Sequence, residues 1–279
     1  MRPVHIRFVF ASTIAFFMCI ATPQSAEAGP LFASKFEDTR KAAQSRAEFC
    51  QAIREPGYFQ KLLADSDNRL AFVNGAHGIA GGGVCWWHNR IQRAALYLAV
   101  FRPEKAKPSR QKALQIIEQL KSMDRVVEIP GYANLREFSA DYSREMIASL
   151  ENWQVADGIF GGGWINGLAR TPQTPAENWN ILLNLKKRTD RGRIPLIIIN
   201  QPNSVISHSA LVADVHMYTK DFAAVALLDP NFPKLGIVTV AQYQNGIYLF
   251  PITMIGYESD YEKFAAAHAC YCQKKCARR

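Results

Sequence analysis

Three residues that lie far apart in the chain have the side-chain types that covalent acyl transfer needs. Cys85 follows a run of three glycines and precedes a long apolar segment. His208 opens a strand-like run, and Asp229 closes the next such run. A thiol, an imidazole and a carboxylate can act as nucleophile, general base and orienting group. The sequence therefore predicts nucleophilic thiol chemistry at Cys85, His208 and Asp229.

The position of Cys85 favours an ionised thiol. A free thiol has a pKa of about 8.5, which a helix N-terminus or a neighbouring imidazolium lowers to roughly 3.5–7.5. The glycines before Cys85 cannot easily belong to a helix, whereas Trp86 and the residues after it can. The helix dipole and free N–H groups would then stabilise the thiolate, and the same donors could face a tetrahedral oxyanion. A buried structural cysteine at the start of a core helix is the alternative.

The order of the strands suggests that His208 and Asp229 meet. A hairpin turn at residues 220–221 would make their strands antiparallel and place the two residues level with each other. The carboxylate could then accept a hydrogen bond from the imidazole and fix its tautomer. An ordinary turn is the alternative for Asp229, Pro230 and Asn231, because all three residue types are common in turns. Asn231 is the alternative orienting group.

Four other histidines compete for the role of base. His88 lies one helical turn past Cys85, but a base on the same helix seldom points at the correct side of the thiol. His77 lies in the glycine-rich stretch before the nucleophile. His216 and His268 are expected to face solvent or to have structural roles.

The N-terminus has the features of a secretory signal. Arg2 and Arg7 precede an apolar stretch from Phe8 to Ala21, and the small-residue site 26–28 follows. The stretch is short for a membrane span, which needs about 20 apolar residues. We expect cleavage after Ala28, a secreted or periplasmic location and no stable membrane anchor; a retained anchor is the alternative.

Five cysteines remain after that cleavage: Cys50, Cys85, Cys270, Cys272 and Cys276. Exported proteins oxidise structural cysteines in pairs, so an odd count leaves one thiol free or paired with another chain. The last three cysteines lie close together, and Cys50 is the natural distant partner for one of them. The sequence thus predicts two disulfides and a free Cys85. A zinc site is the alternative use of the C-terminal cysteines, although their spacing fits no common finger.

Residues 29–279, which follow the signal, are expected to form one domain. No Pro/Gly/Ser-rich linker divides them, and they are numerous enough to bury a substantial core. The net charge of +9 is dispersed apart from residues 186–188 and the end of the chain. Such basicity favours solubility, and no basic motif interleaved with aromatic residues indicates nucleic-acid binding. We expect no nucleic-acid partner, no cofactor and no metal, while the oligomeric state stays open.

The pattern of the chain changes after residue 190. The first part, 29–190, reads as helical, with candidate helices at 36–54, 57–68, 85–101, 109–123 and 134–155. The second part, 191–260, has strand candidates at 196–200, 210–218, 222–228, 235–242 and 246–251. The short polar breaks between these runs are typical of hairpins. Residues 261–279 form a cysteine-rich basic tail. Helices followed by antiparallel strands predict an α+β fold.

At these residues the chain resembles the papain-like cysteine peptidase superfamily. The similar segments are Gly83-Val84-Cys85-Trp86, His208-Ser209-Ala210 and Leu228-Asp229-Pro230-Asn231-Phe232. The last segment looks most like the YopT-type effector peptidases. The resemblance, which spans roughly residues 73–251, implies a papain-like fold in which the nucleophile helix packs on an antiparallel sheet. It also implies thiol peptidase activity by Cys85, His208 and Asp229 on a protein or peptide substrate.

The chain departs from the family pattern at one position. The family often has an oxyanion-hole Gln six residues before the nucleophile, and this chain has Ile79 there. Asn74 or an amide of the glycine-rich stretch is the expected substitute. Two other functions stay open on the same fold: an acyltransferase or transglutaminase-like enzyme, and a catalytically inactive binding or effector module.

Overall fold

The computed structural model describes residues 39–75, 83–157, 174–200, 207–231, 237–243, 252–256, 258–274 and 276. Every element below belongs to the compact unit that comprises residues 36–279. The expected signal, residues 1–28, and the strand expected at 246–251 lie outside the described residues.

The described helices lie mainly before the large sheet in the sequence. They are α2 (Arg46–Ala52), α3 (Tyr58–Ala64), the short 3-10 helix η1 (Ser66–Asn68), α4 (Cys85–Leu98), α5 (Arg110–Ser122), α6 (Leu135–Asp141), α7 (Ser143–Ala156), α9 (Pro175–Thr189) and α10 (Asp260–Gln273). Two of them, α9 and α10, were not predicted. A capping box between Thr174 and Glu177 begins α9, and α10 occupies most of the segment expected to be a tail.

The strands form two sheets. In the smaller sheet, β1 (Ala99–Arg102) pairs in parallel with β2 (Val127–Pro130). The larger sheet contains β3 (Leu196–Asn200), β4 (Ser207–Met217), β5 (Phe222–Leu228), β6 (Ile237–Tyr243) and β7 (Ile252–Gly256). Its strand order is β6-β5-β4-β3-β7, and all neighbours are antiparallel. The predicted α+β class and the antiparallel pairing are confirmed.

Several predicted boundaries were wrong, and local causes explain them. The helix predicted at 85–101 ends at Leu98, because the β-forming residues Val100 and Phe101 are buried in β1 instead. The helix predicted at 134–155 is two helices that break at Tyr142. The helix predicted at 36–54 begins only at Arg46, where the Ser45 hydroxyl caps it by accepting a hydrogen bond from the Glu48 amide.

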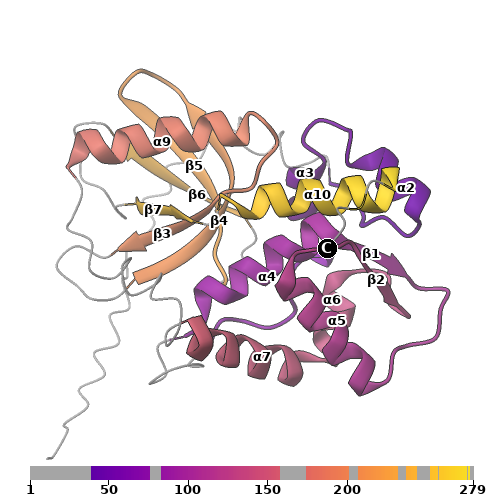
Figure 1. Cartoon of the computed structure of the whole chain (residues 1–279). Helices are drawn as coiled ribbons and strands as arrows, with labels where there is room; N and C mark the ends of the chain where they lie inside the picture. The colour runs from indigo at the N-terminus through magenta and orange to yellow at the C-terminus, as the bar shows by residue number, and fades with distance from the viewer. Residues whose placement is uncertain are drawn as a thin grey trace, which may run out of the picture. The chain divides into compact units, whose positions relative to one another are not determined.

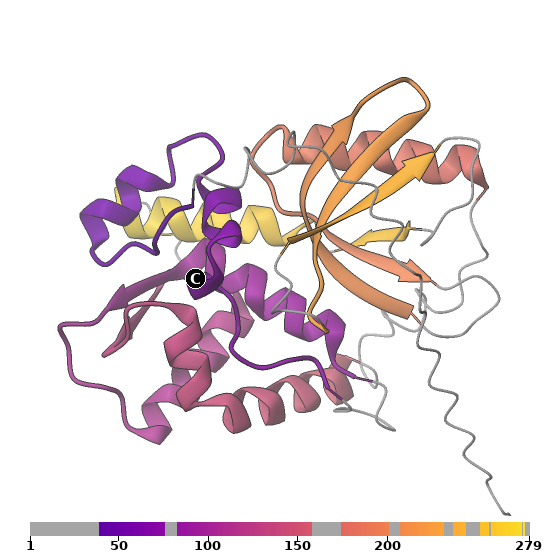
Figure 2. The same ribbon diagram turned by 180° about the vertical axis from the view of Figure 1, so that it is seen from behind.

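Helices α4 and α9 cover opposite faces of the large sheet (Figure 1, and from behind in Figure 2). Trp179, Leu182 and Leu185 of α9 pack on alternate residues of the strands, which include Ala210 and Val212 of β4. Side chains alternate between the faces of a strand, so Ser209 and Leu211 face the other way, toward α4. The sheet is therefore buried on both faces around β4, the strand that carries His208.

Disulfides link the C-terminal helix to the start of the domain. Cys50 of α2 is bonded to Cys272 of α10, and Cys270 is bonded to Cys276. Cys85 is the free cysteine of the described residues, so the predicted pairing is confirmed. The C-terminal sulfurs are all consumed in disulfides, which contradicts the zinc alternative. Two disulfides are consistent with an exported protein. No described helix is long and apolar enough to cross a membrane.

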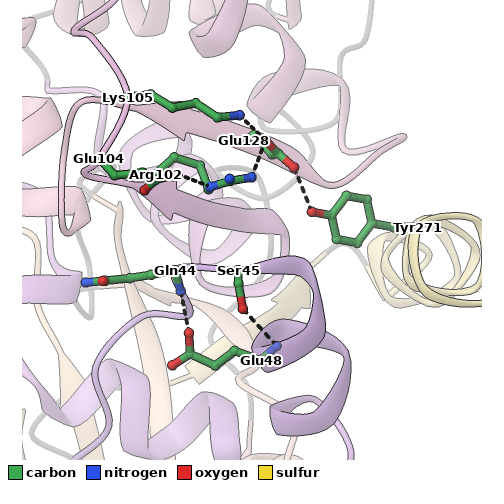
Figure 3. A network of polar contacts seen from close by, with 8 residues as sticks. All are labelled: Gln44, Ser45, Glu48, Arg102, Glu104, Lys105, Glu128 and Tyr271. Atoms are coloured by element: carbon green, nitrogen blue, oxygen red, sulfur yellow. Dashed lines mark hydrogen bonds and ion pairs between the residues drawn. The ribbon is translucent and has the colours of Figure 1, made fainter.

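Polar contacts fasten α10 to the small sheet (Figure 3). The Glu128 carboxylate accepts hydrogen bonds from Arg102 at 3.0 Å, Lys105 at 2.9 Å and the Tyr271 hydroxyl at 3.0 Å. Tyr271 precedes the bridged Cys272, so a covalent and a polar link act at the same end of α10. This end of the molecule is thus held together through groups that are distant in sequence.

A buried ionic cluster holds the other end of α10 to α4. The Asp260 carboxylate, which is fully buried, accepts a 2.6 Å hydrogen bond from the fully buried Arg93. It also accepts two hydrogen bonds from Arg90, at 3.2 and 3.3 Å. Arg93 and Arg193 both lie over the ring of Tyr261. The cluster fixes the helix that carries Cys85 against α10.

Candidate active site

Cys85 is the first residue of α4, as the sequence predicts. Gly83, just before the helix, has φ +81°, which favours glycine, and a Cβ there would lie 2.9 Å from the Asn74 amide nitrogen. No side chain caps the helix start at Val84. The first-turn amides of a helix have no intrahelical acceptor, so they and the macrodipole favour an anion at this position.

Two contacts seat the start of α4 on the sheet. The Asn89 amide donates hydrogen bonds of 2.9 Å to both the carbonyl and the hydroxyl oxygens of Ser209. The ring of Trp86 lies against Gly256 of β7 so closely that no Cβ would fit there. Asn89 and Ser209 are each buried, at 1% exposure, so this link between helix and strand is shielded from water. The nucleophile is thereby placed over the first residues of β4.

His208 and Asp229 lie side by side at the end of the β4–β5 pair. The His208 Nε2 and the Asp229 Oδ1 are 2.8 Å apart. They are not level, contrary to the register expected from the sequence. Leu211 pairs with Leu228, so Asp229 would face residue 210, two residues from His208. A β-bulge between Val212 and Asp214 sets this register, and the diagonal geometry still lets the long imidazole reach the carboxylate.

The thiol of Cys85 meets both His208 and Ser209. Burial alone would raise the pKa of Cys85. Hydrogen bonding to His208, the positive charge of that ring, and hydrogen bonds from the side chain and backbone of Ser209 outweigh burial and lower the pKa of Cys85 below its ordinary 9.0. Since Asp229 occupies Nε2, Nδ1 is the ring nitrogen left to serve the sulfur.

The pKa of His208 is shifted in the opposite direction to that of Cys85. Burial would lower the pKa of His208, but hydrogen bonds to Asp229 and Cys85 and the negative charges of both raise it to about 10. A lowered thiol pKa and a raised imidazole pKa favour a thiolate–imidazolium pair over the neutral thiol and imidazole. Such a pair supplies a nucleophile and a proton donor without any prior proton transfer.

We expect the alkylation rate of Cys85 by iodoacetamide to rise in two steps with pH. The first step, below pH 9.0, reports the lowered pKa of Cys85. The second, near pH 10, reports the loss of the His208 proton, after which the thiolate is no longer paired with a cation. Alkylation that is quenched at set times and quantified by mass spectrometry over a series of pH values measures both steps. A single step centred at or above pH 9.0 would show that no ion pair forms.

Asn74 joins the loop before α4 to the turn after β5. Its Oδ1 accepts a 2.7 Å hydrogen bond from the Val84 amide, and its Nδ2 donates to the Asn231 Oδ1 at 2.8 Å. Its backbone amide donates to the Pro230 carbonyl at 2.9 Å. Asn231 in turn donates its backbone amide to Asp229 at 2.8 Å. Asn74 and Asn231 therefore brace the segments that carry the thiol and the carboxylate.

We expect Asn74→Ala to slow the alkylation of Cys85 several-fold, because the Val84 amide loses its acceptor and the start of α4 is released. Iodoacetamide alkylation forms no oxyanion, so this readout separates bracing from oxyanion stabilisation. An alkylation rate equal to that of the unaltered protein would contradict the bracing role. Asn134→Ala, which removes the cap of α6 and lies outside the site, is the matched control.

The remaining histidines do not serve Cys85. His88 is buried, its Nε2 lies 3.2 Å from the Phe72 carbonyl, and burial lowers its pKa to about 4. His268 bonds the Tyr97 carbonyl at 2.7 Å, and His216 is exposed on β4. His77 and Ile79 lie outside the described residues. Among the described histidines, His208 is the one that contacts the thiol.

The sequence did not indicate the roles of Ser209 and Asn89. Ser209 adds donors to the sulfur, and Asn89 fixes Ser209 in place. One signal was present, because Asn89 lies one helical turn after Cys85 and therefore shares its face of the helix. A polar amide on a buried face needs a partner, although the sequence does not say which one.

Comparisons of the chain with family models, with curated proteins and with solved structures returned no match. The assignment of a chemistry to this site therefore depends on the geometry described above.

Proposed function

We propose that this protein is an exported, papain-like thiol peptidase that acts by Cys-His-Asp acyl transfer on protein or peptide substrates. The observation that carries the proposal is the 2.8 Å contact between the His208 Nε2 and Asp229, together with the lowering of the pKa of Cys85 by His208. The position of the thiol at the start of α4, packed on β4, also supports the papain-like assignment.

The reaction begins with the thiolate of Cys85. It attacks the carbonyl carbon of a peptide bond, and the carbonyl oxygen takes the electron pair. The C–N bond then breaks while His208 gives its proton to the leaving amine. Water attacks the resulting thioester and loses a proton to His208, and the thiolate leaves with the electron pair of the C–S bond. Asp229 holds the imidazole in one orientation through both halves.

The oxyanion needs donors near the sulfur. A backbone amide at the start of α4 is the donor we assign, because the helix N-terminus offers N–H groups where no side-chain cap competes. Asn74 is a weaker candidate, because its Oδ1 already accepts one hydrogen bond and its Nδ2 already donates one. This assignment needs no Gln before the nucleophile.

A denatured-protein digest analysed by mass spectrometry tests the proposal. We expect the unaltered protein to generate new peptide termini, and Cys85→Ala to generate none. Asp229→Asn should reduce cleavage by about 10²–10⁴-fold, because orientation of the base is lost. Asp221→Asn, in the turn before the opposite end of β5, is the matched control and should retain full activity.

Two other outcomes would reassign the protein. Incorporation of an added amine in place of hydrolysis would indicate an acyltransferase. The absence of both reactions, together with slow alkylation of Cys85 at neutral pH, would indicate an inactive binding module on this fold.

A further inference from the structure

A cavity of about 480 Å³ lies far from Cys85, where the loop between α2 and α3 meets the end of α9 and the middle of α10. Tyr97, near the end of α4, forms part of its wall. Since α4 rises about 1.5 Å per residue, some 18 Å of helix separate Tyr97 from Cys85. The volume falls within the roughly 300–1,000 Å³ that is typical of small-molecule sites.

The inner wall of the cavity is a column of rings. Phe59 stacks on Tyr97 with ring centroids 3.9 Å apart, and Tyr97 stacks on Phe264 at 4.6 Å. His268 lies parallel to Phe59 at 5.9 Å and bonds the Tyr97 carbonyl. Burial lowers the pKa of His268, so this ring adds no positive charge. The wall therefore offers a rigid, uncharged aromatic surface.

The rim carries both cations and acids. Arg54, Arg191 and Arg193 line the cavity with two acids, Glu55 and Asp190. Of these cations, Arg193 lies 3.6 Å from the Glu258 carboxylate.

Both acids are already paired with bases that lie outside the cavity. Arg40 bonds Glu55 at 2.9 Å, and Lys186 bonds both Asp190 oxygens at 2.8 Å. In contrast, neither Arg54 nor Arg191 forms a side-chain hydrogen bond or ion pair within the described part of the chain. Two free guanidinium groups thus stand at the entrance to an aromatic cavity.

We propose that this cavity binds a small organic anion with a planar apolar body. The carboxylate, sulfonate or phosphate group would bind Arg54 and Arg191, whose planar forks suit such oxyanions. The apolar body would lie against the ring column, where its burial drives binding. The cavity does not include Cys85, so this proposal does not depend on the proposed peptidase activity.

Fluorescence titration with 1-anilinonaphthalene-8-sulfonate tests the proposal. We expect one molecule to bind per chain, with weaker binding of the uncharged analogue N-phenyl-1-naphthylamine. Arg54→Gln combined with Arg191→Gln should raise the Kd by about tenfold or more. Ala265→Trp should abolish binding, because Ala265 is an exposed residue of the cavity wall and the indole would fill the space.

Matched controls make the same changes in charge and side-chain volume at positions that do not line the cavity. Lys187→Gln combined with Lys263→Gln removes two nearby exposed charges, and Ala266→Trp adds the same ring on a neighbouring exposed position. These controls should bind the probe normally. No saturable binding to the unaltered protein would overturn the proposal. So would equal losses in test and control variants. Alkylation of Cys85 should be unchanged in every variant.

Discussion

His208→Ala will slow the alkylation of Cys85 at pH 6 by about 100-fold or more. The imidazolium is the main group that lowers the pKa of the thiol, and burial, which raises it, remains after the substitution. The thiolate fraction at pH 6 therefore collapses, and the rate of alkylation follows it. The thiolate absorbance near 240 nm, titrated against pH, should show the pKa of Cys85 rising in the variant.

His216→Ala is the control for this experiment. It removes the same side chain from the same strand, but at the exposed far end of β4. Its alkylation rate and thiolate titration should match those of the unaltered protein. Similar rates in the two variants would mean that His208 does not ionise Cys85, and the peptidase proposal would lose its main support.

Asp260→Asn will lower the free energy of unfolding by about 3–5 kcal/mol. Asp260 is fully buried and compensates two arginines, of which Arg93 is also fully buried. Asparagine keeps the shape of the side chain but removes the negative charge that faces the fully buried Arg93, while Arg90 keeps its longer contact with Asp157 at 3.9 Å. Loss of a buried counter-charge is strongly destabilising. Urea unfolding with the disulfides intact measures the change.

Glu104→Gln is the matched control, since it removes a carboxylate from an exposed ion pair with Arg102. Surface pairs contribute about 0–1 kcal/mol, so this variant should unfold near the original urea concentration. A loss for Asp260→Asn as small as that of the control would show that the cluster does not hold α4 to α10. In that case the placement of Cys85 would depend mainly on the contacts of Trp86 and Asn89.

Local residue patterns predicted several features correctly. The start of α4 at Cys85 was predicted from the glycines before it. Glycine has a low helix propensity, whereas the residues that follow are compatible with a helix, so the boundary is a local feature of the sequence. The odd number of cysteines after the expected cleavage, with three of them close together near the C-terminus, indicated that Cys85 is the free thiol. Alternating β-branched runs with short breaks gave the antiparallel strands, since period and turn length are local properties.

Non-local packing decided what local patterns could not. The strand β1 follows α4 directly, and only its pairing with the distant β2 explains why the helix ends at Leu98. Likewise, β7 pairs with β3, which is distant in the sequence, and not with β6, which directly precedes it. In the same way, the β-bulge in β4 sets the offset between His208 and Asp229. No short window of sequence contains these pairings.

Local sequence specifies which chemical groups this protein possesses and the order in which they occur: a thiol at a helix start, an imidazole at a strand start and a carboxylate at a strand end. The packing of distant segments brings these groups together, places Ser209 and Asn89 beside them, and sets arginines from separate loops at an aromatic cavity. The physical reason is distance along the chain. Propensity and periodicity act over a few residues, whereas contacts across more than a hundred residues are fixed by how the helices and strands pack.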